Sequence, residues 1–548
     1  MKKTLRYHIV WILQSFILPI VFALPGPTTT TGNLSVGKFY TFSVTPNSSY
    51  PDSYSNEWTA GAELTDETSG GSTYSNYVGW LGAAAYSFDI ILDLGKSYTI
   101  RQTQLNCASR TSWGIYYPQS VNIYIRNTST ENWASFGTIT GGSNTSTHSS
   151  AWLSYTGSSQ SARYVKFTIN SPGNHTFVSE IEVYGDIQNS WKNVPDWGCY
   201  HGAYPAINYS LQIGTFESRV EKDLSMVLWY ENMGDAGFAS YLGYLWWNET
   251  YNYAGCLEQG LNYTGARYLE IGWEPEATIT AAQIAQGYYD SYFKQWFTES
   301  ITYSNRNNNT DPVWIRAMSE MNGSWTFVGN DAAWGGDPIN FRRAWRRMYN
   351  IAEQVGAADK HIFLFSPNGV SYPDESWNEP KDYYPGDQYV DWVGMSVYYN
   401  SSAIAYPSDV IQPFYNQWSY KPMIISEGAL YTTNDVNGVQ WVNDWFDTQY
   451  NFPMIKALVW FDSGDFSLSA LSTNVLNTYK QRASNSYILN QSIAGRLDYN
   501  SDYFVNFVDF VPLAEHWRAT SSNQTGDING DNNVNFDDLK IMMDLWLE

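Results

Sequence analysis

The chain has 548 residues, of which 43% are hydrophobic, 17% aromatic and only 15% charged, and its formal net charge is −23. This length predicts two to four domains, and the apolar content excludes wholesale disorder. The acidic balance argues against nucleic acid and anionic membranes as partners, and against polyanionic polysaccharides as substrates. The aromatic side chains, 25 Trp and 44 Tyr among them, suit the apolar faces and hydroxyl rims of neutral sugars, although packed cores must use most of them.

Residues 1–23 have the pattern of a secretory signal, with basic residues in the first six positions, an apolar stretch and a final segment suited to cleavage. The stretch is short for a membrane span, and no other long apolar run follows. We therefore expect a secreted or extracellular protein with no membrane span after signal removal. Three cysteines do not form a disulfide framework, and both a Cys199–Cys256 bridge and buried free thiols remain open.

Residues 33–186 predict an all-β sandwich. This segment is rich in Ser, Thr, Gly and Tyr, and short alternating apolar runs are separated by turn residues. Runs of this kind are found at 88–94, 121–125 and 164–169.

The same segment resembles a discoidin-type jelly roll, a fold whose relatives include family 32 carbohydrate-binding modules. The matching residues are Leu64-Thr65-Asp66, Trp80, the D-L-G turn at 93–95 and the closing runs R-Y-V-K-F and E-I-E-V-Y-G. The resemblance implies a glycan-binding module with a calcium loop. In that loop Asp66 is the metal candidate, and Glu67 stands where a glycine usually follows.

Residues 191–490 predict a (β/α)₈ TIM barrel, because strand-like runs alternate with helix-like stretches such as 279–303 and 341–356. The active site of such a barrel gathers at the C-terminal ends of its strands. Eight strand-like runs are counted, at 197–204, 224–230, 267–273, 312–319, 361–366, 390–398, 422–426 and 455–461.

Two glutamates stand at the ends of predicted barrel strands. Glu320 closes the fourth strand within R-A-M-S-E-M-N-G-S-W, and Glu427 closes the seventh within S-E-G. A lone glutamate there is usually a solvated strand end. Two of them in aromatic, weakly charged surroundings favour a glycosidase, which needs one carboxyl to protonate the leaving oxygen and one to attack or to activate water.

The barrel segment resembles glycoside hydrolase family 26, whose best-known members are β-mannanases. The resemblance spans nearly the whole barrel, through G-C-Y-H-G-A-Y (198–204), G-W-E-P (272–275), F-R-R-A-W-R-R-M-Y (341–349), S-P-N (366–368), Y-Y-P-G-D-Q-Y-V-D-W-V-G (383–394), S-E-G (426–428) and L-V-W-F-D (458–462). It implies a retaining hydrolase. The sequence departs at Ser319, where typical mannanases of the family have His, so mixed-linkage β-glucan and β-1,3-xylan remain alternatives to β-1,4-mannan.

The resemblance assigns Glu320 as acid/base and Glu427 as nucleophile, and implies that Tyr398 donates a hydrogen bond to Glu427. It also implies that Trp460 forms the floor beneath the sugar at the cleavage point. Further substrate-binding candidates are Arg316, Asn322, Trp273, Trp325 and Trp377.

The last fifty residues contain two calcium-type loops, in which oxygen side chains recur at positions 1, 3, 5, 9 and 12. Together they resemble a type I dockerin, a small α-helical calcium module covering 495–548, and this implies a cohesin-type partner on a scaffold or cell surface. A calcium-stiffened cap without a partner is the alternative. The predicted ligands are Asp498, Asn500, Asp502, Asn506 and Asp509 in the first loop, and Asp527, Asn529, Asp531, Asn535 and Asp538 in the second.

The sequence therefore predicts a secreted modular endo-glycosidase, with structural calcium and no catalytic cofactor. Two other classes remain open: a catalytically silent glycan-binding or matrix protein that keeps the barrel as a scaffold, and a surface-layer glycoprotein. The presence of both glutamates favours the enzyme.

Overall fold

The structure is a computed structural model. It describes residues 27–52, 63–71, 74–82, 85–195, 198–207, 210–211, 213–233, 247–248, 251–252, 268–276, 278–306, 312–326, 334–399, 406–432, 434–485, 487–489, 510–518, 533–536 and 538–539. The predicted signal, Cys256 and most of the predicted calcium ligands at the C-terminus lie outside these residues. Within them, no helix combines the length and apolarity needed to cross a membrane.

The N-terminal part is an antiparallel, sandwich-like sheet, as the alternating runs predict. Its strands follow the order β1-β8-β4-β7-β5-β6, with β2 beside β4 and β3 beside β8. The inward residues, such as Ile90, Leu92, Ile123 and Phe167, form one apolar core. The strands are β1 (Thr29–Asn33), β2 (Tyr40–Phe42), β3 (Val78–Leu81), β4 (Tyr86–Ser109), β5 (Ser120–Arg126), β6 (Ala134–Thr140), β7 (Ser149–Ser171) and β8 (His175–Gln188).

The second part is a closed barrel of eight parallel strands, consistent with the predicted TIM barrel. Neighbouring strands pair in chain order, and the last strand pairs with the first to close the ring. The strands are β9 (Cys199–Tyr204), β12 (Met226–Met233), β15 (Tyr268–Pro275), β16 (Val313–Ala317), β17 (His361–Phe365), β18 (Trp392–Tyr399), β19 (Met423–Leu430) and β20 (Ile455–Phe461).

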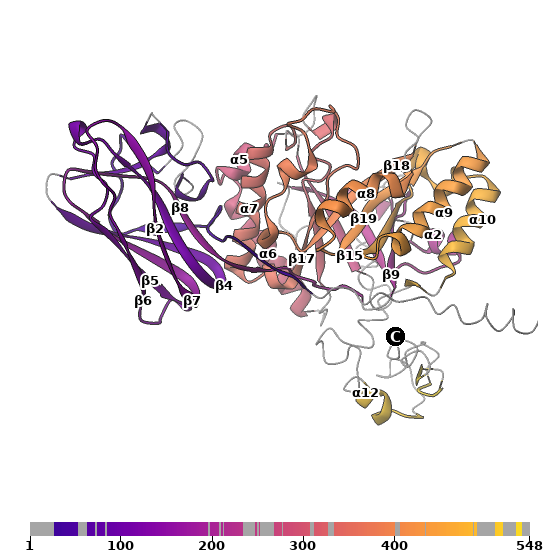
Figure 1. Ribbon diagram of the computed structural model, residues 1–548. Coiled ribbons are helices and arrows are strands. Elements are labelled where there is room, and N and C mark those ends of the chain that lie inside the picture. Colours follow the sequence, from indigo (N-terminus) through magenta and orange to yellow (C-terminus); the bar gives the residue numbers. More distant parts are fainter. Residues whose placement is uncertain are drawn as a thin grey trace, which may run out of the picture.

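Helices surround this barrel (Figure 1). They are α2 (Ile213–Val220), α5 (Ala281–Ala285), α6 (Asp290–Arg306), α7 (Pro338–Val355), α8 (Pro407–Trp418), α9 (Asp435–Asn451) and α10 (Thr473–Ala483). The stretch predicted as one helix over 279–303 is two helices, α5 and α6, because Gly287 takes a positive φ of 87° between them. Beyond the barrel, α12 (Phe510–Glu515) is a short helix within the predicted calcium module.

Two apolar layers follow from strand alternation in the barrel. One face of each strand points into the lumen and contributes Leu228, Tyr268, Trp314, Ile362 and Ile424. The other face packs against the helices and belongs to the largest core of the molecule. The side chain at a given strand position therefore faces either the lumen or the helices, and this decides which residues reach the site.

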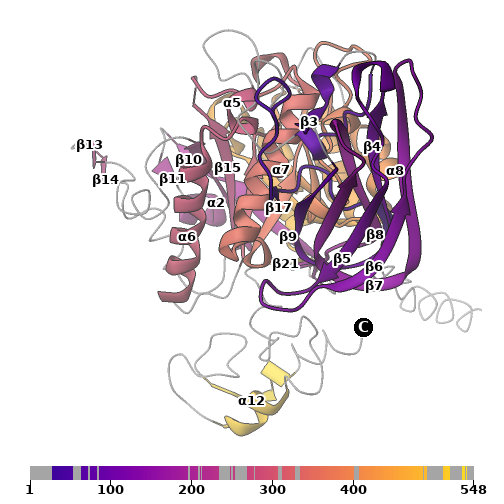
Figure 2. The ribbon, with the colours of Figure 1, turned by 90° about the vertical axis from the view of Figure 1, so that its left-hand side faces the viewer.

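The sandwich contacts the barrel along α7, and Figures 1 and 2 show the two parts side by side there. Lys38 Nζ lies 2.6 Å from Glu353 Oε2 and donates to Asn350 Oδ1 at 2.8 Å. The predicted D-L-G turn also lies against this helix: a Cβ added at Gly95 would stand 1.9 Å from Glu353 Oε2. The two parts are thus joined by close, specific contacts.

The predicted calcium loop is part of the same junction. Asp66 Oδ2 lies 2.7 Å from Arg343 Nη2, and Glu67 Oε2 lies 2.8 Å from Arg346 Nη1. Glu67, which replaces the usual glycine, has a φ of 70°, the left-handed conformation that glycine adopts most readily. Its ion pair with α7 explains what the side chain does at this position.

Candidate active site

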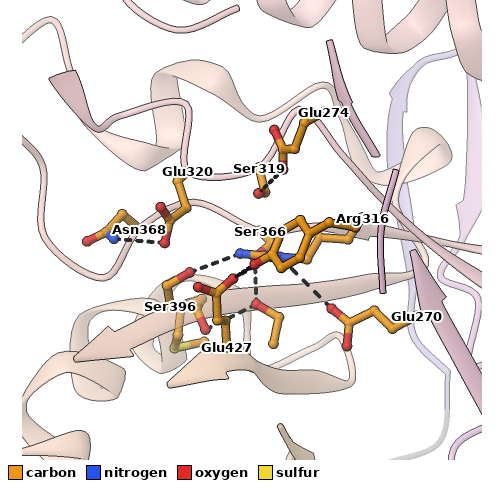
Figure 3. A network of polar contacts seen from close by, with 12 residues as sticks. Glu270, Glu274, Arg316, Ser319, Glu320, Ser366, Asn368, Ser396 and Glu427 are labelled. Atoms are coloured by element: carbon orange, nitrogen blue, oxygen red, sulfur yellow. Dashed lines mark hydrogen bonds and ion pairs between the residues drawn. The ribbon is translucent and has the colours of Figure 1, made fainter. Parts of the chain in front are cut away.

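The end of β16 and the C-terminal half of β19 bring Glu320 and Glu427 into one polar network, which Figure 3 shows. Glu320 follows β16 by three residues. Its φ of 54° and the φ of 47° at Met318 turn the chain sharply, and the Glu320 amide donates to Ser366 O at 2.9 Å. This turn fixes the backbone of Glu320 to the end of β17.

Glu427 lies within β19, which continues to Leu430, beyond the predicted end at 426. The pairing with β18 shifts by one residue, so Ile425 lies opposite Met395 and Glu427 opposite Ser396. This bulge puts two consecutive side chains, Ser426 and Glu427, on the lumen side, where simple alternation would allow only one.

Three donors converge on the Glu427 carboxylate. Arg316 Nη1 lies 2.7 Å from Oε2, the Tyr230 hydroxyl also donates to Oε2, and the Tyr398 hydroxyl donates to Oε1. Burial and the charge of Glu427 raise the pKa of both phenols well above the ordinary value, so both stay protonated and remain donors. Such surroundings stabilise an ionised carboxylate.

Arg316 is a fully buried cation beneath this carboxylate. Its other nitrogens donate to Ser366 Oγ and Ser396 Oγ, both at 3.0 Å, and its exposed fraction is 0%. Burial alone would lower its pKa, but Tyr230 and Glu427 raise it well above the ordinary value. The guanidinium therefore carries a permanent charge on the lumen side of β16.

Glu320 has the opposite electrostatic setting. Burial raises the pKa of its carboxyl group, the negative charge of Glu427 raises it further, and Arg316 opposes both. Asn368 Nδ2 donates to Oε1 at 3.0 Å, and Trp325 Nε1 donates to Oε2 at 2.8 Å. The two carboxyl groups thus differ in their surroundings: Glu427 is paired with a cation, whereas burial and a neighbouring carboxylate raise the pKa of Glu320.

This division suits an acid and a nucleophile acting on the same bond. A group that keeps its proton to higher pH can donate it to a leaving oxygen, and an ionised carboxylate can attack carbon. The distinction arises from neighbouring residues, because both groups are glutamates in the same lumen.

Two tryptophans predicted to bind substrate are placed elsewhere. Trp273 and Trp460 are both 0% exposed and face the helices. Trp273 stacks on Trp296 of α6 with ring centroids 4.3 Å apart, and Trp460 packs 5.6 Å from Trp445 of α9. The prediction that they contact sugar is corrected by strand alternation, since each lies one position away from a lumen-facing residue.

Phe461 faces the lumen where Trp460 was expected to do so. Its ring stacks on Tyr204 at a centroid distance of 5.1 Å and meets Tyr398, which donates to Glu427, edge-on at 6.1 Å. The aromatic rings beside Tyr398, close to Glu427, are therefore those of Phe461 and Tyr204.

The other predicted substrate contacts divide by exposure. Trp325 and Trp377 are 44% and 43% exposed, respectively. Arg316 and Asn322 are fully buried and act behind the site. Asn322 holds Asn368 through hydrogen bonds to its backbone N at 2.8 Å and its carbonyl at 2.9 Å, so it orients the residue that contacts Glu320.

The sequence interpretation missed two lumen carboxyls on β15, Glu270 and Glu274. The signal was present: Glu270, Gly272 and Glu274 alternate and fall on one face of the strand. It also missed Tyr230, whose ring lies over Gly272, where an added Cβ would stand 2.6 Å from Tyr230 Cδ1. The absence of a side chain at Gly272 thus leaves room for the Tyr230 ring, whose hydroxyl contacts Glu427.

Ser319, the departure noted in the sequence, hydrogen-bonds one of these carboxyls. Its hydroxyl donates to Glu274 Oε1 at 2.5 Å. Burial raises the pKa of Glu274 to about 7, while Arg316 and the Ser319 hydrogen bond oppose that rise. Ser319 therefore precedes Glu320 where typical mannanases have His, and its hydroxyl contacts a further carboxyl group, that of Glu274.

The predicted metal ligands are only partly described. Among the described residues, no group of three or more His, Cys, Asp or Glu is arranged to hold a metal ion. Asp66 accepts from Thr68 N at 2.8 Å and pairs with Arg343. In the second C-terminal loop, Asp538 is buried and accepts from Asn535 N at 2.8 Å. Calcium at either place stays a prediction.

Cys107 and Cys199 are buried and free.

Residues 300–453 match the model of glycosyl hydrolase family 26. The match covers β16 to α9 and includes both Glu320 and Glu427. It supports a glycoside hydrolase, which the placement of the two carboxyls independently suggests. No curated protein gives a match to this chain.

Several solved structures resemble parts of the chain. The catalytic domain of a family 26 endo-β-1,4-mannanase from Bacillus sp. JAMB-750 is 16% identical, with 54% of this chain and 87% of that chain covered and a TM-score of 0.39. A β-mannanase from a symbiotic protist of the termite Reticulitermes speratus is 13% identical, with coverages of 54% and 88% and a TM-score of 0.38.

A chitosan-binding module from a Paenibacillus sp. IK-5 chitosanase/glucanase is 22% identical, with 28% of this chain and 99% of that chain covered and a TM-score of 0.20. All three TM-scores are below 0.5. The functional argument therefore rests on the family 26 match and on the geometry of the site.

Proposed function

We propose that this chain is a secreted, retaining endo-glycosidase that hydrolyses a neutral β-linked polysaccharide. β-1,4-Mannan is the first candidate substrate, and mixed-linkage β-glucan and β-1,3-xylan are the alternatives. The observation that carries the proposal is the pair of lumen glutamates inside the segment matching family 26: Glu427 is compensated by Arg316, and Glu320 has a raised pKa.

In the proposed mechanism, Glu320 protonates the glycosidic oxygen while Glu427 attacks the anomeric carbon, giving a covalent glycosyl–enzyme and a released sugar. Glu320, now ionised, takes a proton from water, which displaces Glu427 from the anomeric carbon. The resulting configuration is the starting one. Tyr398 and Tyr230 hold the two oxygens of Glu427 in fixed positions before the attack.

The charge of the chain supports a neutral substrate. Its formal net charge is −23. A polyanionic glycan would approach so acidic a protein at an electrostatic cost. Ser319 in place of His leaves mannan only modestly ahead of glucan, because a short hydroxyl that donates to Glu274 offers different contacts to a sugar hydroxyl.

The direct experiment is a panel of β-mannan, mixed-linkage β-glucan, β-1,3-xylan, alginate and pectin, with the anomer of the first product followed by NMR. We expect oligosaccharides from one of the three neutral glycans, with the β-anomer formed first. Products from alginate or pectin alone contradict the substrate class. An initial α-anomer contradicts retention. No product from any glycan favours the silent glycan-binding protein.

The outer modules have proposed roles as well. We infer that the N-terminal sandwich binds glycan and holds a calcium ion near Asp66. Glu180 supports this, because it is buried, its Oε2 has no hydrogen-bond partner, and the charge of Asp66 contributes to its raised pKa. Calcium is a hard cation that prefers oxygen ligands, and a buried carboxyl oxygen without a hydrogen-bond partner is a suitable ligand for it.

At the C-terminus we propose two calcium ions in the loops of 498–509 and 527–538, and docking to a cohesin-type partner on a scaffold or cell surface. Without cations the loop carboxylates repel one another, so the module should loosen on chelation. Calorimetry of the whole chain, with and without Asp498→Ala and Asp527→Ala, tests the first part. Unchanged calcium stoichiometry contradicts it. A pull-down with the native secretome tests docking.

A further inference from the structure

Glu270 is a buried titratable group that the proposed mechanism does not use. It lies on the lumen face of β15, is 0% exposed, and pairs in register with Leu228 of β12 and Trp314 of β16, both apolar. It stands two positions deeper than Gly272, below the level of the catalytic groups. A sugar at the strand ends does not reach it.

Glu270 has no hydrogen-bond partner on either carboxyl oxygen. Its closest charged neighbour is Arg316, whose Nε lies 3.9 Å from Glu270 Oε1 and donates instead to Ser366 Oγ. Figure 3 shows the guanidinium between Glu270 and Glu427. One cation therefore stands between two carboxyl groups, and only Glu427 receives its hydrogen bond.

The protonation of Glu270 follows from these surroundings. Burial raises its pKa to about 8; Arg316 opposes the rise and Glu427 adds to it. The charged groups that act on it are Arg316 from β16 and Glu427 from β19. The Tyr230 phenol from β12 contacts both of those groups. At neutral pH Glu270 is mostly uncharged, and a neutral carboxyl group does not attract the guanidinium of Arg316 as an ion would.

We propose that Glu270 is a positioning residue: its charge state decides whether Arg316 keeps its hydrogen bond and ion pair with Glu427. Glu270 thereby sets the alkaline limit of nucleophilic attack. While Glu270 is neutral, Arg316 holds Glu427. When Glu270 loses its proton, it draws the guanidinium toward itself and repels Glu427, and the nucleophile loses both its counter-charge and its orientation. This inference rests on the proposed function.

The experiment compares the wild-type chain with Glu270→Gln, using a dinitrophenyl β-glycoside of the oligosaccharide that the polysaccharide panel identifies. Such a leaving group needs no proton, so kcat/KM reports nucleophilic attack and not the protonation of Glu320. Below pH 7 the two proteins should agree within about threefold, because glutamine resembles the neutral acid. At pH 9 the wild type should fall about tenfold from its plateau, as expected for a group titrating near pH 8, and the variant should keep more than half of its own.

The matched control is Glu63→Gln. Glu63 lies in the sandwich, is 3% exposed, and burial raises its pKa to about 8 as well. The same chemical change at this distant position should leave the alkaline limb where the wild type has it. Superimposable alkaline limbs for wild type and Glu270→Gln overturn the inference, and so does an equal loss of activity by that variant at every pH, which indicates a merely structural role.

A second measurement needs no substrate. Between the ordinary pKa of a free glutamate and about pH 8, folded Glu270 keeps a proton that the unfolded chain releases, so this group makes the wild type less stable as pH rises. The Tm of Glu270→Gln relative to wild type should therefore increase from pH 5 to pH 8 and then level off. A flat difference overturns the inference. A wild type inactive on every glycan counts instead against the proposed function.

Discussion

The barrel lumen and the module junction place glutamates in opposite electrostatic settings. In the lumen, Arg316 faces four carboxyl groups, and the pKa of Glu320 is raised. At the junction, Arg342, Arg343 and Arg346 of α7 face Asp66 and Glu67. Burial alone would raise the pKa of Glu67, but Arg346 and its neighbours outweigh it and hold that pKa below the ordinary value.

Both Glu320 and Glu67 lie on sharp turns with positive φ, so local backbone does not separate them. The ratio of cations to acids does. Glu320 faces a second carboxyl group and one arginine, whereas Glu67 faces three arginines that lower its pKa. The adjacent Asp66 is more deeply buried, and burial raises its pKa to about 6 despite Arg343. The predictions below test this contrast from its strongest consequence to its weakest.

Removing the compensated carboxylate should have the largest effect. Glu427→Gln keeps the volume and the hydrogen-bonding shape but cannot attack carbon, so kcat should fall roughly 10⁴-fold or more. Steady-state hydrolysis of the active polysaccharide measures this. Azide should restore turnover in Glu427→Ala with inversion of the product. A variant that keeps full activity contradicts the assignment of the nucleophile.

Removing the protonated carboxyl should have a smaller effect that depends on the leaving group. Glu320→Gln should lower kcat about 10²–10⁴-fold on polysaccharide, and far less for the first step on a dinitrophenyl glycoside. Because the pKa of Glu320 is raised, the wild type should keep polysaccharide activity above the ordinary pKa of glutamate, and lose it as pH rises through the folded value. Equal losses on both substrates would contradict the role of Glu320 as acid.

At the junction, the expected loss is of stability and not of catalysis. Lys38→Met leaves Glu353 buried without its cation, and both partners are nearly inaccessible, at 1% and 7% exposure. Breaking a buried pair from one side costs about 3–5 kcal/mol. Thermal and urea unfolding should show the loss, while kcat/KM well below the transition stays at the wild-type value. Exposed Lys96→Met is the control. A catalytic defect without destabilisation would contradict the division between the two regions.

The smallest effect separates two adjacent aromatic residues. Phe461→Ala should raise KM several-fold, because it removes part of the lumen floor beside Tyr398, whereas Trp460→Phe should mainly lower stability. Initial rates over a substrate range, together with unfolding curves, separate the two. A higher KM for Trp460→Phe with unchanged stability would restore the original prediction.

The sequence predicted the barrel well because strand runs and their order are local patterns. All eight strand-like runs overlap strands of the closed ring. Glu320 follows the end of β16 as expected, whereas Glu427 lies within β19, which runs four residues past its predicted end. Which side of a strand each side chain faces was harder to predict. Trp460 and Phe461 are neighbours of similar type, and a one-residue error in alternation exchanges sugar contact for core packing.

The sequence could not supply the charges that decide protonation. The bulge at Ser426 places Glu427 on the same side of the strand as Arg316. Gly272, which has no side chain, leaves room for the Tyr230 ring. A hydrophobic pattern predicts neither feature. Likewise, nothing near Asp66 in the sequence indicates that its cation partner, Arg343, comes from another module 277 residues later.

The central claim is that Glu427 is the nucleophile and Glu320 the acid, a division set by Arg316. Trapping tests it most directly: incubation with a 2-deoxy-2-fluoro glycoside of the active sugar and a good leaving group, followed by peptide mass spectrometry. We expect one covalent glycosyl label, on Glu427, with turnover blocked. A label on Glu320, Glu270 or Glu274, or rapid turnover without any label, would contradict the account.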